Sequence, residues 1–202
     1  MQVRQLTVPD AFEFTPPNFP DHRGLFVAPF QEEAFAKAVG HPLRLGQSNH
    51  SVSRRGVIRG MHFADVPPGQ AKYVYCPRGA VLDVILDVRA GSPTFGVWDA
   101  MRLDPVDFRA VYLPEGLAHG FVALEDDSVV SYLCSTGYSP AAERGINPLD
   151  GNLGLPWPAD VPAVLSEKDT AAPTLAEALS TGVLPSYAEC VAHYERMRAG
   201  IG

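Results

Sequence analysis

Hydrophobic and polar positions alternate with a period of two along much of the chain. Residues 72–76 alternate in this way, and from Leu82 to Val88 every second residue is aliphatic while Asp83, Asp87 and Arg89 lie on the other face. Turn signals rich in Pro and Gly separate such segments at short intervals, as at 67–69, 77–79, 91–93, 104–105 and 114–116. The pattern predicts an all-β fold of short antiparallel strands, namely a sandwich, jelly roll or barrel.

Helical signals are confined to three short stretches. We expect helices over 31–39, 174–179 and 187–197, the last with Ser186 as its N-cap. The length of 202 residues suits one domain, so residues 1–202 are predicted to form a single β domain with a helical tail at about 173–199. The Gly- and Pro-rich stretch from Asn147 to Asp160 is predicted to be a surface loop.

Charge and composition exclude several classes of partner. The formal net charge is -7 and Lys and Arg are not clustered, which argues against binding to nucleic acid polymers. No segment has the roughly 18 consecutive apolar residues of a membrane span, and the N-terminus lacks the apolar core of a signal peptide. Cys76, Cys134 and Cys190 are odd in number and widely spaced, which favours reduced thiols. We therefore expect a cytoplasmic protein without a membrane partner.

Two histidines in apolar, strand-like sequence are the main candidates for chemistry. His62 lies in Arg-Gly-Met-His-Phe (59–63), and His119 follows the turn Pro-Glu-Gly (114–116). An imidazole that titrates near neutrality, with the cation of Lys72 nearby, suits proton abstraction next to a carbonyl. The alternative at this point is a pair of hydrogen-bonded core histidines.

The turn 114–119 is similar to the second conserved turn of the cupin jelly rolls, which has a Pro, one residue, a Gly, two residues and a His. Metal-binding cupins carry two histidines separated by one residue in the earlier strand, followed by a Glu. The matching place here holds Gly60 and His62, and residues 63–72 contain no Glu. Since a mononuclear metal site normally has three or four protein or water ligands, the sequence predicts no metal site.

With these departures from the metal-binding cupins, the sequence resembles a narrower family, the dTDP-4-dehydrorhamnose 3,5-epimerases. The resemblance is to actinobacterial members in particular, which include those of antibiotic deoxysugar pathways. Seven motifs carry the resemblance in order along the chain: 19–24 (FPDHRG), 47–49 (QSN), 59–63 (RGMHF), 70–72 (QAK), 91–96 (GSPTFG), 117–121 (LAHGF) and 165–169 (LSEKD). The resemblance implies a cupin-type jelly roll, isomerase activity without a cofactor, and a homodimer.

The resemblance also implies a set of catalytic roles. His62 matches the family's base, Asp169 the carboxylate that orients it, Lys72 the group that stabilises the enolate oxygen, and Tyr132 the acid on the opposite face. These roles agree with the chemistry, because removing a proton beside a C4 ketone requires a base, an oxyanion partner and an acid. Asp83 is a further candidate to hold either histidine.

The resemblance also implies that a second set of residues binds a dTDP-sugar. These residues carry cations, amides, an aromatic ring or a carboxylate suited to the diphosphate, the hydroxyls and the base. They are Arg23, Arg59, His119 and Lys168 for the diphosphate and sugar, Gln47 and Asn49 for hydroxyls, Tyr138 for stacking on thymine, and Glu143 as an acceptor.

Two departures from the family pattern bear on the sugar. Ala28 occupies a place that is usually acidic, and 146–150 reads Ile-Asn-Pro-Leu-Asp where an aromatic residue, Asn and Asp are common. They favour a deoxy or amino sugar of an antibiotic pathway. The predicted function is inversion of C5, with C3 as a second candidate centre, of a dTDP-4-keto-6-deoxyhexose. The alternatives are a 3,4-ketoisomerase acting on the same nucleotide sugar and a non-catalytic nucleotide-sugar-binding cupin.

Overall fold

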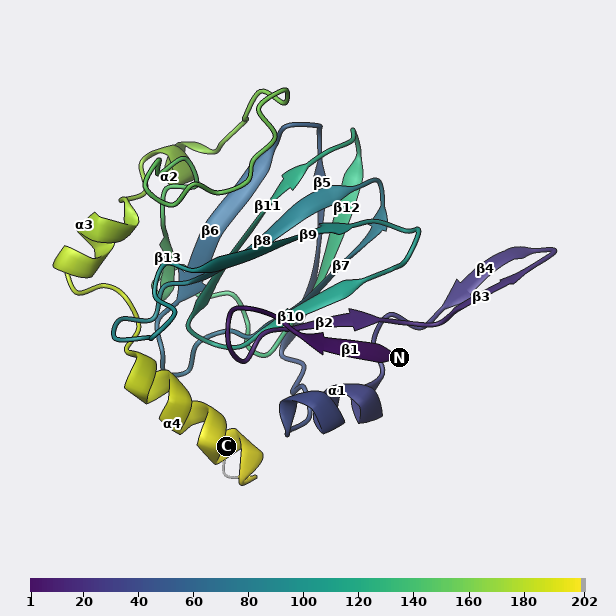
Figure 1. Ribbon diagram of the computed structural model, residues 1–202, viewed down its shortest axis with the longest axis horizontal. Helices are drawn as coiled ribbons and strands as arrows, with labels where there is room; N and C mark the ends of the chain where they lie inside the picture. Colours follow the sequence, from purple (N-terminus) through teal and green to yellow (C-terminus); the bar gives the residue numbers. More distant parts are fainter. Residues whose placement is uncertain (201–202) are drawn as a thin grey trace.

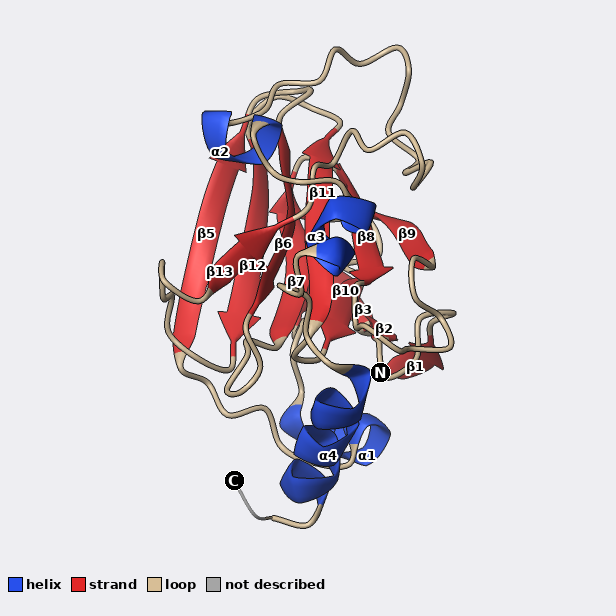
Figure 2. Ribbon diagram, turned by 90° about the vertical axis from the view of Figure 1, so that its left-hand side faces the viewer, coloured by secondary structure: helices blue, strands red, loops and turns tan. Residues whose placement is uncertain are grey.

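Two antiparallel sheets packed face to face form the body of the computed structural model, which describes residues 1–200 (Figures 1 and 2). One sheet has the order β1-β2-β10-β7-β12-β5, and the other has the order β13-β6-β11-β8-β9. The first contains β1 (Gln2–Gln5), β2 (Phe12–Thr15), β5 (Gln47–Ser53), β7 (Lys72–Arg78), β10 (Ala110–Leu113) and β12 (Ser128–Cys134). The second contains β6 (Ile58–Ala64), β8 (Val81–Asp87), β9 (Trp98–Leu103), β11 (Leu117–Ala123) and β13 (Glu143–Gly145). The predicted all-β, cupin-like jelly roll is confirmed.

A third, two-stranded sheet projects from the body as an arm. It consists of β3 (Asn18–Asp21) and β4 (Gly24–Val27), paired only with each other (Figure 1). Three of its large apolar side chains are substantially exposed, with relative exposures of 55% for Phe19, 46% for Leu25 and 68% for Phe26. Apolar side chains clustered this way on a protein surface are typical of an interaction site. The alternation of the sequence did not indicate that this segment leaves the body.

The helices agree with the sequence predictions to within a residue at each end, apart from one additional helix. They are α1 (Glu32–Val39), α2 (Glu167–Thr170), α3 (Leu175–Ser180) and α4 (Tyr187–Arg198). The predicted N-cap of α4 is confirmed, since the Ser186 side chain accepts a hydrogen bond from the Glu189 amide. The single-turn α2 was not predicted. No helix in residues 1–200 is long and apolar enough to cross a membrane.

Apolar clusters pack between the two sheets and against part of the outer face of each, whereas alternate residues of β5 are exposed. Val74, Ile85, Phe121 and Val130 belong to the core between the sheets. In a second cluster of buried apolar side chains, α3 packs against the outer face of the five-stranded sheet. In a third cluster, Phe35 of α1 packs against the outer face of the six-stranded sheet. Both faces of β8 are consequently buried, including the face that carries Asp83 and Asp87.

A buried ion pair attaches the C-terminal helix to this body. The Arg89 guanidinium donates to both carboxylate oxygens of Asp87, at 2.9 and 2.8 Å, and lies 5.1 Å from the ring centre of Tyr187. Ser92 and Thr94 also donate to Asp87, each at 2.7 Å. Burial alone raises the pKa of Asp87, but Arg89 and the two hydroxyls outweigh burial and hold that pKa below its usual value.

A bulge in β6 brings two polar residues to the same face of the strand. Arg59 pairs with Phe121 and His62 with His119, so three steps along β6 match two along β11. The bulge depends on Gly60, which has a φ of +147° and whose added Cβ would lie 2.5 Å from the Cα of Gly120. Gly60 therefore has no room for the side chain that a metal-binding cupin carries at the matching place.

We predict that Gly60→Ala lowers the free energy of unfolding by about 2–4 kcal/mol, because it combines a strained φ with a clash against the β11 backbone. The control is Gly91→Ala, since Gly91 also has a positive φ, +85°, but open space around it; it should lose only about 1 kcal/mol. Urea unfolding followed by circular dichroism measures both. Equal losses would show that close packing at Gly60 is unimportant.

Candidate active site

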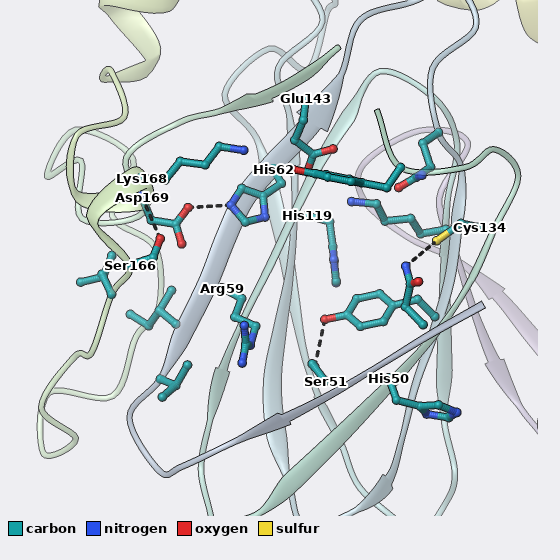
Figure 3. A pocket seen from close by; sticks show the side chains of 18 of the residues that line it. His50, Ser51, Arg59, His62, His119, Cys134, Glu143, Ser166, Lys168 and Asp169 are labelled. Carbon is teal, nitrogen blue, oxygen red and sulfur yellow. Dashed lines mark hydrogen bonds and ion pairs between the residues drawn. The ribbon is translucent and has the colours of Figure 1, made fainter. Parts of the chain in front are cut away.

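A cavity of about 550 Å³ opens between the two sheets, a volume within the usual range for small-molecule sites (Figure 3). Its walls come from strands β5, β6, β7, β11, β12 and β13 and from the segment that contains α2. Ten of the twelve residues predicted from the sequence line it. They are Asn49, Arg59, His62, Lys72, His119, Tyr132, Tyr138, Glu143, Lys168 and Asp169.

His62 and Asp169 form a hydrogen-bonded pair at the cavity wall. The His62 Nε2 lies 2.6 Å from the Asp169 Oδ1. Burial raises the pKa of Asp169, but the hydrogen bond and charge of His62 outweigh burial and lower that pKa below its usual value. An ionised carboxylate only accepts hydrogen bonds, so Nε2 carries the proton and donates it to Asp169. The other ring nitrogen, Nδ1, is thereby left for a ligand, on an imidazole whose side chain is 25% exposed.

The position of Asp169 is set by the short helix α2. The Ser166 hydroxyl caps the helix by accepting from the Asp169 amide at 3.1 Å. The preceding segment is tied to β6, because the Ile58 amide donates to the Val164 carbonyl at 2.9 Å. The cap pattern, Ser166 followed three residues later by an acidic residue, is the signal by which the sequence could have indicated α2.

His119 belongs to a second, more deeply buried pair. Its Nε2 lies 2.7 Å from the Asp83 Oδ2, and both side chains are almost fully buried. Of the two histidines, it is thus His119 that Asp83 holds. The His119 ring meets the Tyr132 ring edge-on, with the ring centres 6.0 Å apart. Figure 3 shows His62 and His119 beside the same space, and Tyr132 lines that cavity with them.

The phenol of Tyr132 is held by a residue that the sequence analysis did not assign. The Ser51 Oγ lies 3.4 Å from the Tyr132 hydroxyl (Figure 3). Burial raises the pKa of Tyr132 well above its usual value, so the phenol carries its proton near neutral pH and can donate it. Ser51 lies two residues after Asn49 on β5, so extending the period-two alternation from Asn49 would have indicated it.

Three cations and two carboxylates line the cavity. The cations are Lys72, Arg59 and Lys168, and the carboxylates are Glu143 and Asp169. Arg59 of β6 is oriented by the end of β5 in the other sheet, donating to the Ser53 hydroxyl at 3.1 Å and to the Val52 carbonyl at 3.3 Å. Within residues 1–200 Lys72 makes no ion pair, which leaves its ammonium group for a ligand. The cavity of this acidic protein thus carries more cations than carboxylates, although the formal net charge of the chain is -7.

Two of the predicted binding residues lie outside the cavity wall. Gln47 stands behind it and fixes two wall residues, donating to the Asn49 Oδ1 at 2.6 Å and accepting from the Tyr138 amide at 2.9 Å. Arg23 lies on the arm, where it is exposed and paired with Asp21 at 2.6 Å. The structure therefore does not bring Arg23 to the cavity of its own chain.

Several wall residues were not predicted as site residues. Cys134 lies two residues after Tyr132 on β12 and receives a weak hydrogen bond from the Asn49 amide at 3.7 Å, while burial raises the pKa of its thiol. The others are His50, Ser51, Val57, Ile58, Gln70, Val164, Leu165 and Ser166. Residues 146–150, which the sequence analysis connected with the sugar, do not line the described cavity; Asp150 instead accepts from the Leu175 amide at 3.0 Å.

The fold and this site define a class of cupin-type protein whose cavity holds a histidine hydrogen-bonded to a carboxylate, a lysine and a protonated phenol. Such a set can remove a proton beside a carbonyl, stabilise the resulting oxyanion and return a proton. Within residues 1–200 no group of three or more His, Cys, Asp and Glu side chains is placed to hold a metal ion. The absence of a metal from the enzyme's mechanism stays a prediction.

Comparison with known proteins identifies the family. Residues 5–177 match the family model of dTDP-4-dehydrorhamnose 3,5-epimerase. The chain is 50% identical to the dTDP-4-dehydrorhamnose 3,5-epimerase of Mycolicibacterium smegmatis, covering 100% of this chain and 99% of that protein. It is 53% identical to the dTDP-4-dehydrorhamnose 3-epimerase of Streptomyces niveus, covering 95% and 92%. The chain therefore belongs to the dTDP-4-dehydrorhamnose 3,5-epimerase family, as the motifs indicated.

A solved structure supports the same relationship. The chain superposes with a TM-score of 0.94 on ChmJ, a 3'-monoepimerase from Streptomyces bikiniensis in complex with dTDP-quinovose. The sequence identity is 46%, and the match covers 96% of this chain and 98% of that one.

We predict that His62→Ala raises the pKa of Asp169, because the buried carboxylate loses the hydrogen bond that offsets its desolvation. In the parent protein this lowered pKa adds stability that is present above the ordinary carboxyl pKa and is lost as the pH falls through the folded-state value; the variant should lose that contribution. Carbon-13 NMR titration of the side-chain carboxyl measures the pKa. His119→Ala, which leaves the pair intact, is the control and should not shift it.

Proposed function

We propose that this protein is an epimerase that inverts the stereocentres flanking the ketone of a dTDP-4-keto-6-deoxyhexose. The observation that carries this proposal is the grouping of the His62–Asp169 pair, Lys72 and Tyr132 around one cavity in a chain of this family. The proposal further assigns Asn49, Arg59, His119, Tyr138, Glu143 and Lys168 to substrate binding.

In the proposed reaction the His62 Nδ1 removes the proton from a carbon next to C4. Asp169 stabilises the imidazolium that forms, since it accepts from Nε2 at 2.6 Å. The electrons of the broken C–H bond move into the carbonyl, and the ammonium of Lys72 stabilises the negative charge that develops on the enolate oxygen. Tyr132 then delivers a proton from the other face, with its hydroxyl held by Ser51. No redox step and no external reactant other than solvent protons are needed.

The names of the relatives bear on which of the two carbons, C3 or C5, is inverted. C3 occurs in the names of both the 3,5-epimerase of Mycolicibacterium smegmatis and the 3-epimerase of Streptomyces niveus, whereas C5 occurs only in the former. The sequence analysis had put C5 first. We therefore propose C3 inversion as the shared step and C5 inversion as the step that depends on proton return by Tyr132.

We predict that the parent protein incorporates solvent deuterium into dTDP-4-keto-6-deoxyglucose and that His62→Ala reduces this exchange by at least about 100-fold, because general-base catalysis typically contributes that much. Tyr132→Phe should still exchange protons but give little C5-inverted sugar, with less effect on C3. Proton NMR of a single sample measures label position and stereochemistry together.

Calorimetric titration with dTDP is the control, since neither change should weaken nucleotide binding strongly. Rapid exchange by His62→Ala would remove His62 from the reaction. C5 inversion at the parent rate by Tyr132→Phe would return Tyr132 to a packing role. A product whose carbonyl had moved to C3 would indicate a 3,4-ketoisomerase, and dTDP binding without exchange would indicate a binding protein.

We further propose that the protein is a homodimer in which each arm reaches the other subunit. Arg23 is assigned to substrate binding yet lies on the projecting arm, outside the cavity of its own chain. The same arm exposes Phe19 and Phe26, which a second subunit would cover. Arg23 would then act in the cavity of the partner. Ala28, which follows the arm directly, would face the same partner site, so the proposed deoxy or amino sugar depends on this arrangement.

Subunit mixing tests this arrangement. We expect Arg23→Ala and His62→Ala proteins to have low activity alone, and a mixture allowed to exchange subunits to recover activity. In a mixed dimer one site would combine the intact His62 of one chain with the intact Arg23 of the other. The assay is deuterium exchange, with analytical ultracentrifugation to confirm dimers. Failure of a mixed dimer to recover activity would place Arg23 in its own chain's site.

We also propose a cytoplasmic location. Cys76, Cys134 and Cys190 are all buried free thiols, as the sequence analysis expected, and reduced thiols are typical of that compartment.

A further inference from the structure

A second cavity, of about 240 Å³, lies between the C-terminal helix and the loop that follows α1. His193 and Met197 of α4 form one side of it, and the stretch from His41 to Arg44 forms another. It adjoins the active-site cavity but is separate from it. Lys72 and Cys134 line the active site, whereas the neighbouring residues Ala71 and Ser135 line the second cavity.

A buried carboxylate in its wall lacks part of its hydrogen bonding. Glu115 is only 3% exposed. Its Oε1 accepts from the Ser135 hydroxyl at 3.0 Å, but within residues 1–200 its Oε2 has no hydrogen-bond partner. The His193 Nε2 is 4.0 Å from Oε1, which makes an ion pair when His193 is protonated but is beyond hydrogen-bond distance. A buried carboxylate oxygen without a donor is costly, and a donor that enters the cavity would remove that cost.

The backbone around Glu115 is fixed, so a ligand would meet a preformed acceptor. The Tyr194 hydroxyl donates to the Glu115 carbonyl, and the Ala71 amide donates to the Ser135 hydroxyl at 2.8 Å. The terminal torsion of a glutamate side chain has a broad distribution of angles. A small rotation can therefore present Oε2 to a bound molecule.

The rest of the wall of the second cavity indicates the shape and polarity of the remainder of the ligand. Leu43, Pro68, Ala71 and Met197 give the cavity a largely apolar lining. The volume exceeds the about 150 Å³ of an engineered apolar cavity that holds benzene, so one ring with a short side chain fits. Arg44 is exposed at the margin, where solvent screens its charge, whereas the Glu115 carboxylate is buried.

We propose that this cavity is a second binding site, for a small primary amine with an apolar body, in which the ammonium group donates to Glu115. The proposal does not depend on the epimerase function. The ammonium group supplies both the missing donor and a charge opposite to that of the buried carboxylate.

Benzylamine, which is protonated at pH 7, is the probe, and the full chain is titrated by isothermal calorimetry and by NMR. We expect the amide signals of Ala71, Ser135 and Thr136 to shift. Glu115→Gln, which keeps an acceptor for Ser135 but removes the charge, should weaken binding by roughly tenfold or more. Met197→Trp, which fills the cavity from the helix surface, should abolish binding while leaving Glu115 unchanged.

Benzyl alcohol and benzoate are the matched ligands, and both should bind at least about tenfold more weakly than benzylamine. Equal binding of benzyl alcohol would overturn the assignment of an amine, and preferred binding of benzoate would show that Arg44 rather than Glu115 selects the ligand. Displacement of benzylamine by dTDP, or unchanged binding to both variants, would place the amine elsewhere and refute the site.

Discussion

The close approach of Gly60 and Gly120 is the constraint on which the active-site cavity depends. Strands β6 and β11 can form the bulge only because neither glycine carries a Cβ, since a Cβ on Gly60 would lie 2.5 Å from the Cα of Gly120. The bulge changes the alternation of β6, so that Arg59 and His62, three residues apart, both line the cavity. In a regular strand they would point to opposite faces.

The two histidine–carboxylate pairs differ in burial, and the difference suits different roles. His119 and Asp83 are enclosed between the sheets, where the pair can position a ring against Tyr132. His62 is partly open to the cavity and keeps one ring nitrogen free, while Asp169 behind it is almost fully buried. A base must reach its substrate, whereas its carboxylate partner is most effective when water is excluded. The proposed assignment of His62 as base follows this difference in exposure.

The arm and the C-terminal helix extend the structure in two different ways. The arm carries Arg23 away from the body and leaves Phe26 exposed, so its proposed role requires a second subunit. Helix α4 is instead fixed inward by the buried Arg89–Asp87 pair and by Tyr194, which donates to the Glu115 carbonyl just before β11. This docking also closes the side of the second cavity that His193 and Met197 line.

Local sequence patterns were enough to indicate the fold class and the family, and to name ten residues that line the cavity. Alternation of period two and frequent turns indicated antiparallel sheets, because the side chains of a strand point alternately to its two faces. Short motifs around His62, Lys72 and His119 indicated the family, because such motifs can be read directly from the order of residues along the chain. The folded structure was needed to show that Asp83 holds His119, that Ser51 contacts Tyr132, that Arg23 lies on an arm, and that 146–150 lies away from the cavity. The His62–Asp169 pair spans 107 positions and the His119–Asp83 pair 36. Such pairings follow from strand order, a bulge and a helix cap acting together, and no local stretch of sequence contains them.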